Sequence, residues 1–502
     1  MLLSLLLLIP LLGALLITLI PGDRTSAFFR SFTAVLLIAQ CVASAALLIP
    51  FNPADSGLQL IEHFAWLPSI GLDYVLAVDG LSMPLVLMNG VLCLVAALAS
   101  RKIENRPRIY FALLLVISGA VNGAFLAQNL LLFFLFYELE LIPLWMLIAI
   151  WGGTNRAYAS TKFLIVTAVS GMLILGAFLG LALLSGSVDF SLNPVLPGAL
   201  PITTQLLLMG ALLIGFGIKI PLFPFHTWLP DAHTEASTPV SVLLAGVLLK
   251  LGTYGLLRFC LGLFPEAWHL AAPWLAGWAA VSVLYGSLAA IAQTDMKKMV
   301  AYSSVGHMGY VLLAAAAATP LGLIGALFQM VSHGLISAIL FLVVGVVYER
   351  TGTRDLNILR GLLNPQRGLP LSGTLMIIGV MASAGIPGMA GFISEFLIFR
   401  GSLGPFPLAT LLSMVGSGLT AVYFLLLVNR AFFGRLAVAS GQDPNPRVLS
   451  PVPLAQQMPA ILLSLGILVL GLVPHLLVGL SEATTTGLSQ FAVTTISGGL
   501  SS

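Results

Sequence analysis

Seven ionisable side chains lie within long apolar segments of the sequence, and they are the residues best suited to do chemistry. They are Glu138, Glu140, Lys219, Lys250, His307, His333 and Glu395. A charge at the centre of a bilayer costs at least ~2.5 to 3.5 kcal/mol on insertion scales, so such groups normally face a protein interior or a hydrated cavity and mark an ion path. The set therefore predicts proton or ion transfer, and static pairing between helices is the alternative interpretation.

The segment around Lys219, "GFGIKIPLFPFHTWLPDAH", predicts a broken helix. Pro221 and Pro224 have no amide hydrogen, so the carbonyls of Gly217 and Ile220 lose their helical partners. Interrupted helices in transporters expose backbone dipoles to an ion site near the midplane. We therefore predict that Lys219 binds and releases protons, and a lysine locked in a static ion pair is the alternative.

Lys250 and two histidines are further basic groups in apolar helices. Lys250 lies in "VSVLLAGVLLKLGTYGLLRF", whose glycines allow close helix packing, and we predict a second proton carrier there rather than a packing or snorkelling lysine. His307 follows Ser303 by one turn, and His333 follows Gln329 in the same way. Imidazole can pass a proton between its two nitrogens, so a relay and a structural role both stay open. These faces carry no Cys or carboxylate at ligand spacing, so we expect no metal site.

Glu395 lies in "GIPGMAGFISEFLIF", where glycines and a proline indicate a second interrupted helix. Two Gly/Pro-interrupted spans in corresponding halves of a chain are a sign of inverted repeats. Helices four to eight and nine to thirteen would form these two units, and an odd number of spans gives them opposite orientations. We expect a first unit that carries Lys219 and a second that carries Glu395.

Polar residues also follow the first break. His226, Asp231, His233 and Glu235 would form either a hydrated mouth or a plain polar loop. Lys162 is interpreted as a helix-end anchor, with pairing to a neighbouring acid as the alternative.

The composition places the chain in a bilayer. Of 502 residues 59% are hydrophobic and 8% charged, against about 25% charged in a soluble domain, and the mean hydropathy is +1.06. The net charge of +3 includes no basic block, so no nucleic-acid partner is expected. The three cysteines are far apart, which excludes a disulfide framework or a CxxC metal site.

At roughly 20 apolar residues per span, the apolar runs predict an all-α polytopic membrane protein of about fourteen helices. The predicted spans are 1–20, 29–50, 79–100, 109–127, 129–151, 159–184, 203–225, 237–261, 272–293, 299–318, 321–348, 371–399, 406–433 and 456–480. They group into N-terminal helices (1–108), a first repeat (109–261), a second repeat (272–433) and a last helix (456–480). The loop of residues 51–80 is expected to form surface structure on one side.

The basic residues predict the orientation. Of the 21 lysines and arginines, 17 fall in six loops that all follow odd-numbered helices. Because cytoplasmic loops carry an excess of basic residues, we place these loops on the cytoplasmic side and both termini on the opposite, lumenal side. The opening "MLLSLLLLIPLLGALLITLI" lacks a basic start and a cleavage site, so we expect a retained helix.

Several segments resemble the antiporter-like subunits of respiratory complex I, of the M or subunit-4 type. They are "YELELIPLWMLIAIWGG", "KIPLFPFHTWLPDAHTEASTPVSVLLAGVLLK", "KKMVAYSSVGHMGY", "MVSHGLISAILFLVVGVVYER" and "GIPGMAGFISEF". The resemblance implies fourteen helices with two inverted five-helix repeats. It also implies a proton-pumping subunit that holds no cofactor, with quinone or plastoquinone and iron-sulfur clusters in partner subunits and antiporter-like subunits as neighbours.

The resemblance also implies roles for single residues. The essential glutamate of the family corresponds to Glu138, the lysine of its broken helix to Lys219 and its next lysine to Lys250. Its histidines correspond to His307 and His333, and its late glutamate to Glu395. Glu138 should pair with Lys219, Lys219 should exchange protons with Lys250 through waters and histidines, and Glu395 should gate the far half-channel.

Glu140 indicates a particular branch of this family, because many bacterial members have an apolar residue at the corresponding position. The "ELEL" form resembles the D-type subunit of cyanobacterial and chloroplast NDH-1, which implies a thylakoid membrane, plastoquinone as acceptor and reduced ferredoxin or NAD(P)H as donor. Thr234 and Thr238 depart from that pattern and point toward a specialised form in carbon dioxide uptake complexes. A subunit of an Mrp-type cation/proton antiporter and a purely structural subunit are the alternatives.

Glu138 and Glu140 cannot both face Lys219 from one regular helix. At about 100° per residue they lie roughly 200° apart around the axis. The resemblance assigns Glu138 to the channel, so we expect Glu140 to face a neighbouring helix or subunit.

Overall fold

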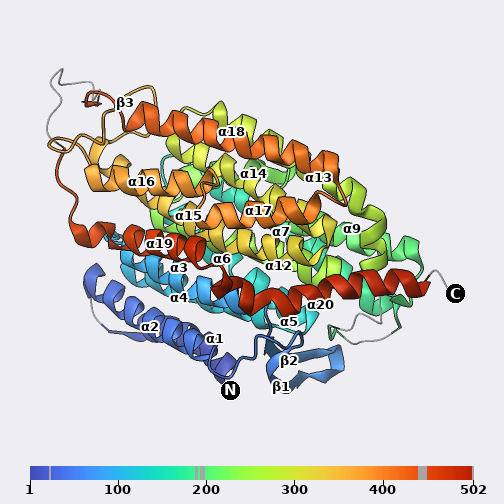
Figure 1. Ribbon diagram of the computed structural model, residues 1–502. Helices are drawn as coiled ribbons and strands as arrows, with labels where there is room; N and C mark the ends of the chain where they lie inside the picture. Colours follow the sequence, from blue (N-terminus) through green and yellow to red (C-terminus); the bar gives the residue numbers. More distant parts are fainter. Residues whose placement is uncertain (22–23, 187–189, 193–197, 439–448, 500–502) are drawn as a thin grey trace.

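The computed structural model describes residues 1–21, 24–186, 190–192, 198–438 and 449–499, which form a bundle of helices lying side by side (Figure 1). Twelve segments are long and apolar enough to cross a membrane, and α3 (Met83–Ala99) and α16 (Pro370–Ser383) are shorter apolar helices. The twelve are α1 (Leu2–Leu19), α2 (Ser26–Ala46), α4 (Pro107–Leu126), α5 with α6 (Leu130–Leu139 and Leu141–Trp151), α7 (Arg156–Leu184), α9 (Ile202–Lys219), Thr238–Leu261, α13 (Pro265–Ile291), α14 (Met296–Ala317), α15 (Pro320–Thr351), α18 (Pro407–Ala431) and α19 (Leu454–Leu472). The predicted helical membrane architecture is confirmed, with 12 to 14 candidate spans.

Three spans form the centre of the bundle. The segment Thr238–Leu261 is wholly buried over its most apolar stretch, and α14 and α15 are 94% and 89% buried, whereas α2 is 28% buried. These three spans carry Lys250, His307 and His333. Three of the four basic groups predicted to carry protons therefore lie in the most buried spans, whereas Lys219 lies at the end of α9, which is 50% buried.

The central segment is not a regular α-helix. It consists of α11 (Thr238–Leu243), a π-helical turn η3 (Leu244–Leu248), α12 (Leu249–Gly255) and a second π-helical turn η4 (Leu256–Leu261). Single π-helical turns inside α-helices occur frequently at functional sites. Lys250 follows the first of these turns by two residues.

The predicted helix 129–151 is interrupted at Glu140, between α5 and α6. Pro143 lies four residues after Leu139 and has no amide hydrogen. The carbonyl of Leu139 therefore lacks its helical donor, which weakens the helix at this point. The acidic pair therefore straddles a break in the helix.

The predicted helix 203–225 is too long, because α9 ends at Lys219. Pro221 cannot donate to the Gly217 carbonyl, and the amide of Leu222 donates to it instead at 2.9 Å. The chain then continues through a short turn, η2 (Phe225–Thr227), into α10 (Trp228–Glu235). The predicted break is confirmed, and it directly follows the lysine.

The second predicted interruption is confirmed, whereas one predicted boundary near the C-terminus is wrong. The range 371–399 holds two helices, α16 and α17 (Ala390–Ser402), separated by Gly385 and Gly388 with φ of +68° and +89°, which favour glycine. The last predicted helix, 456–480, ends at Leu472, because the residue before Pro474 is disfavoured in a helix. A further helix, α20 (His475–Gly499), runs along the lower edge of the bundle in Figure 1 toward the C-terminus.

The loop 51–80 contains a β-hairpin of β1 (Gln59–Leu67) and β2 (Leu72–Val78), which pair antiparallel. The hairpin lies below the helices in Figure 1, close to the start of α1. The carboxylate of Glu62 accepts hydrogen bonds from the amides of Leu3 and Ser4 at 2.8 and 3.1 Å. Two short strands, β3 (Leu359–Arg360) and β4 (Ala437–Val438), pair elsewhere.

Candidate proton-transfer site

Lys219 forms its ion pair with Glu140 and not with Glu138. Its Nζ lies 2.7 Å from Glu140 Oε1, and the two side chains are 1% and 0% exposed. The predicted pairing with Glu138 is therefore wrong. The two glutamates do face different directions, as their spacing predicts, but the break at Glu140 turns this carboxylate inward.

Glu138 lies on the other side, against α7. A Cβ atom built on Gly171 would come within 2.3 Å of Glu138 Oε1, so only a glycine there leaves room for this carboxylate. Glu138 Oε1 is buried and has no hydrogen-bond partner among the described residues. Glu138, and not Glu140, is therefore the half-buried acid next to an outer helix.

Tyr137 completes the surroundings of Lys219. The lysine Nζ lies 3.5 Å from the centre of the Tyr137 ring and donates to the Tyr137 carbonyl at 3.3 Å. Cation–π contacts of this kind contribute about 2 kcal/mol or more when they are desolvated. The break at residue 140 and the break after residue 219 thus meet at one buried cation.

Lys250 has no such acid. Its Nζ donates to the carbonyl of Ala245 at 2.7 Å and lies 2.7 Å from His333 Nδ1. Ala245 belongs to the π-helical turn η3, which offers its carbonyl to the lysine. Among the described residues, no carboxylate lies within ion-pairing distance of Lys250, so the ionisable side chain in contact with it is His333.

The two histidines continue the line. The ring centres of His333 and His307 lie 5.6 Å apart. His307 Nε2 lies 3.0 Å from Ser383 Oγ, and Gln329 Nε2 lies 3.2 Å from His307 Nδ1. If Gln329 donates to Nδ1, the proton of neutral His307 is on Nε2 and points to Ser383. Gln329 precedes His333 by one turn on α15, but its contact with a histidine is the one with His307 of α14.

Glu395 forms the far end of this line. Its Oε1 lies 4.0 Å from His307 Nδ1, and Ser417 donates to its Oε2 at 2.6 Å. Lys250, His333, His307 and Glu395 are each at most 5% exposed. The four side chains form a series of buried titratable groups, in which Lys250 directly contacts His333 and the steps from His333 to His307 and from His307 to Glu395 join neighbours without a direct hydrogen bond among the described residues.

The connection between the two lysines is different. Gly255 and Gly252 pack directly against Phe216 of α9 and Ile220 just after it, where added Cβ atoms would lie 2.2 and 2.8 Å from these side chains. No hydrogen bond or ion pair of the described residues links Lys219 to Lys250 directly. Transfer between them therefore needs water or a movement of side chains at this contact.

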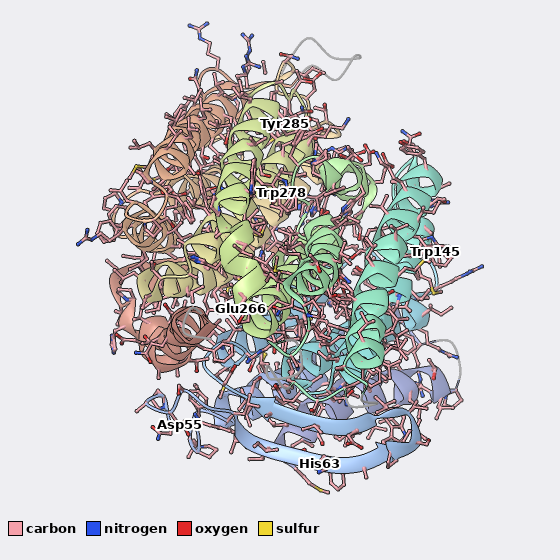
Figure 2. The ribbon with its side chains drawn as sticks, turned by 90° about the vertical axis from the view of Figure 1, so that its right-hand side faces the viewer. Asp55, His63, Trp145, Glu266, Trp278 and Tyr285 are labelled. Atoms are coloured by element: carbon pink, nitrogen blue, oxygen red, sulfur yellow. The ribbon has the colours of Figure 1, made fainter. Side chains whose placement is uncertain are left out.

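The polar residues after the first break are partly paired. Lys162 Nζ lies 2.7 Å from Asp231 Oδ2, so Lys162 pairs with an acid rather than serving as a free anchor. His226 packs its ring 4.7 Å from that of Tyr285 on α13, and Figure 2 shows Tyr285 and Trp278 along the same helix. The Trp278 indole donates to the carbonyl of Phe223, which fixes this turn against α13.

Glu235 lies at a cavity of about 300 Å³, whereas His233 does not line it. Glu235, Thr234 and Lys297 line this cavity, which favours the hydrated mouth over the plain polar loop. His233 is fully buried, stacks on Phe341 with ring centres 4.5 Å apart, and has no hydrogen-bond partner for either ring nitrogen among the described residues.

Some contributing residues were not predicted. Ser383 and Ser417 contact His307 and Glu395 from α16 and α18, and serines in apolar helices give no signal of their own in a single sequence. Among the described residues, no group of three His, Cys, Asp or Glu side chains is placed to hold a metal ion.

A helical bundle with two broken spans and a buried series of lysine, histidine and glutamate defines a class of antiporter-like membrane subunits. Residues 127–421 match the family of the NADH:quinone oxidoreductase and Mrp antiporter transmembrane proteins. The chain is 44% identical to "NAD(P)H-quinone oxidoreductase chain 4 1" of Synechococcus sp. (strain JA-3-3Ab), over 97% of this chain and 92% of the relative. The chain belongs to this family, and the predicted kinship with the complex I subunit-4 type is confirmed.

Solved structures agree with this assignment. A chain of "Respiratory complex I from Thermus thermophilus with bound NADH" is 29% identical, with a TM-score of 0.87 over 98% of this chain and 100% of that chain. A chain of the Mrp complex from Dietzia sp. DQ12-45-1b has the same fold, with a TM-score of 0.85 at 23% identity over 98% of each chain. Chains of complex I and of the Mrp complex therefore share this fold, and at 23% identity the likeness to the Mrp chain shows the fold only.

Proposed function

We propose that this chain is the proton-translocating, subunit-4-type membrane component of a cyanobacterial NDH-1 complex, and that the buried series of side chains carries the protons. The observation that supports this most strongly is the series of closely spaced, buried titratable groups from Lys250 through His333 and His307 to Glu395. A merely structural set would pair each charge with an opposite one, whereas Lys250 has a histidine and a carbonyl as its partners.

The two halves of the chain have separate tasks in this proposal. The Glu140–Lys219 pair holds a proton on the lysine while the two groups are in contact. When the pair opens, the uncompensated lysine is costly in the interior and gives its proton toward Lys250. His333 and His307 then pass the proton to Glu395. Because these groups lie close together, they titrate as one coupled system and no single pKa belongs to one residue.

The inverted repeats belong to the same proposal. Helices α4 to η4 would form the first five-span unit and helices α13 to α18 the second, and the fourth span of each unit is broken. The breaks at Lys219 and at Gly385 to Gly388 fall at corresponding places in the two units. Opposite orientations of the units would open one half of the path to each side of the membrane.

The similarity to NDH-1 subunits supports a proposal for the membrane and the partner subunits of this chain. We infer that electrons pass through cofactors of partner subunits to plastoquinone, with iron-sulfur clusters outside this chain, and that antiporter-like subunits are its neighbours in a thylakoid membrane. The termini would lie on the lumenal side. Thr234 and Thr238 line the cavity near Lys297. Because these two threonines depart from the main D-type pattern, we retain a carbon dioxide uptake complex as the proposed specialised setting.

The test is proton pumping by the intact complex in liposomes with the Lys250→Met variant. We expect electron transfer to continue with fewer protons moved per electron, because the first member of the series can no longer hold a proton. Lys298→Met is the matched control, since this lysine lies at a helix start outside the series. An unchanged proton-to-electron ratio in Lys250→Met contradicts the proposal, and sodium-dependent transport without quinone reduction would favour the antiporter alternative.

A further inference from the structure

A second cavity, of about 330 Å³, lies where the basic loops join the bundle. It is enclosed by the last residues of α3 and α15 and the first residues of α16 and α19. None of the proton-transfer residues lines it. Its volume falls within the range of about 300 to 1,000 Å³ that is usual for small-molecule sites.

The floor of this cavity is apolar and lies well below the helix ends. Leu342 lines it nine residues before the end of α15, which corresponds to about 13 Å along the helix. Ala460 lines it six residues after the start of α19, at a depth of about 9 Å. Leu375 of α16 closes the same side. The cavity therefore extends about 9 to 13 Å inward from these helix ends.

The mouth of the cavity has an excess of positive charge. Arg101 and Lys102 line it together with Glu349, which pairs with Lys102 at 2.9 Å. Arg350 follows Glu349, contacts Gln456 at the cavity wall, and has a buried Nε without a hydrogen-bond partner among the described residues. Glu104 of the same loop is exposed and forms no ion pair within the described part of the chain. Two cations and one acid thus line the mouth, and a third cation, Arg350, lies next to its wall at Gln456.

Arg101 is the cation of this mouth that lacks a paired carboxylate among the described residues. Burial lowers the pKa of Arg101 from its ordinary value, the nearby cation Arg30 lowers it further, and Glu349 acts in the opposite direction without cancelling them. The guanidinium group donates to the carbonyl of Ala455, which supplies no full negative charge. An anion at the mouth would compensate this group.

We propose that this cavity binds an anionic membrane lipid, with its phosphate or sulfonate headgroup at Arg101, Lys102 and Arg350 and its first chain carbons over Leu342 and Ala460. Basic pockets between spanning helices are a recognised way to bind anionic headgroups. A free inorganic anion would use the cations alone, whereas the apolar floor fits a molecule with a hydrocarbon part. The site lies apart from the proton series and is independent of the proposed function.

The test compares lipids bound to the whole purified complex by mass spectrometry after a mild detergent wash and re-addition of phosphatidylglycerol. We expect the Arg101→Gln/Lys102→Gln variant to retain one anionic lipid fewer per complex than the wild type. Arg106→Gln removes a charge from the same loop without lining the cavity, and should retain the full number. Phosphatidylcholine, which has the same phosphate but no net charge, should not replace the lost lipid.

A second variant separates the lipid from a free anion and remains informative if the double variant does not assemble. Ala460→Leu fills the floor of the cavity and leaves every charge in place, so we expect the same loss of one lipid. Unchanged phosphatidylglycerol in Ala460→Leu, or protection by inorganic phosphate equal to that by the lipid, would overturn the proposal. An unchanged lipid count in both variants would show a cavity that holds only water.

Discussion

Lys219 Nζ lies 2.7 Å from Glu140 Oε1 in a fully buried contact, while Glu138, two residues earlier, lies against Gly171. The resemblance to complex I subunits implies that the first glutamate is the essential one. The structure assigns the direct contact with the lysine to the second. The two acids therefore have different tasks: one holds the lysine, and the other faces an outer helix.

The first prediction separates these two acids. Glu140→Gln removes the only carboxylate paired with Lys219 among the described residues, and breaking a buried pair costs about 3 to 5 kcal/mol. We expect this variant to lose most proton pumping while electron transfer continues, and Glu138→Gln to lose less. The proton-to-electron ratio of the reconstituted complex measures both. A larger loss in Glu138→Gln would restore the role that the resemblance implies.

The second prediction concerns the space that Gly171 leaves for the Glu138 carboxylate. In Gly171→Ala the new methyl group would lie 2.3 Å from Glu138 Oε1 and must displace this carboxylate. We expect the variant to show the same pumping defect as Glu138→Gln. Gly176→Ala on the same helix is the control, because nothing lies within 4 Å of the added Cβ there. Equal behaviour of the two alanine variants would show that the position of Glu138 does not matter.

The third prediction concerns stability. Arg258 Nη2 lies 2.6 Å from Asp79 Oδ2, which joins the end of the central span to the start of α3. Asp79→Asn keeps an acceptor for the amides of Leu81 and Ser82 but leaves Arg258 without its charge partner. We expect a loss of about 3 kcal/mol in the free energy of unfolding, seen as a lower Tm of the complex. Pumping per electron should be unchanged in the assembled fraction, and a pumping defect at normal Tm would contradict this structural role.

The fourth prediction concerns pH. Partial burial raises the pKa of Glu62, but hydrogen bonds from Ser4, the amine of Met1 and the amide of Leu3 outweigh it, so the pKa lies below its ordinary value of 4.5. A lowered pKa stabilises the fold above the ordinary value, and this stabilisation is lost as the pH falls through the folded-state pKa.

Glu62→Gln should therefore weaken the contact between the hairpin and α1 at neutral pH by about 1 kcal/mol, the typical contribution of a helix cap. Hydrogen exchange of the amides of Leu3 and Ser4 would measure the effect at two pH values. The difference between variant and wild type should shrink below pH 4. An equal difference at pH 7 and at low pH would show that the carboxylate charge plays no part.

The sequence alone was sufficient for the class of fold and for most of the site. The lysines, histidines and glutamates could be identified because ionisable groups within apolar runs are costly in a membrane and normally mark an ion path. The proline pairs located the break after Lys219. The hairpin and α20 were not predicted as such, since they lie outside the apolar runs that indicate spans.

The partner of Lys219 could not be predicted, for a physical reason. A regular helix separates Glu138 and Glu140 by roughly 200°, but it does not say which one faces inward. The break at Glu140 decides this, and it depends on how α5 and α6 pack against α4 and α7. The contacts of Ser383 and Ser417 depend on the packing of distant helices in the same way.

The central claim is that protons pass through the buried lysines of this chain, and the Lys219→Ala variant tests it most directly. The measurement is proton uptake by liposomes that contain the intact complex, made at a matched rate of electron transfer. We expect fewer protons per electron than in the wild type, because without Lys219 there is no buried cation for Glu140 to hold and release. Unchanged pumping at a normal electron-transfer rate would contradict it.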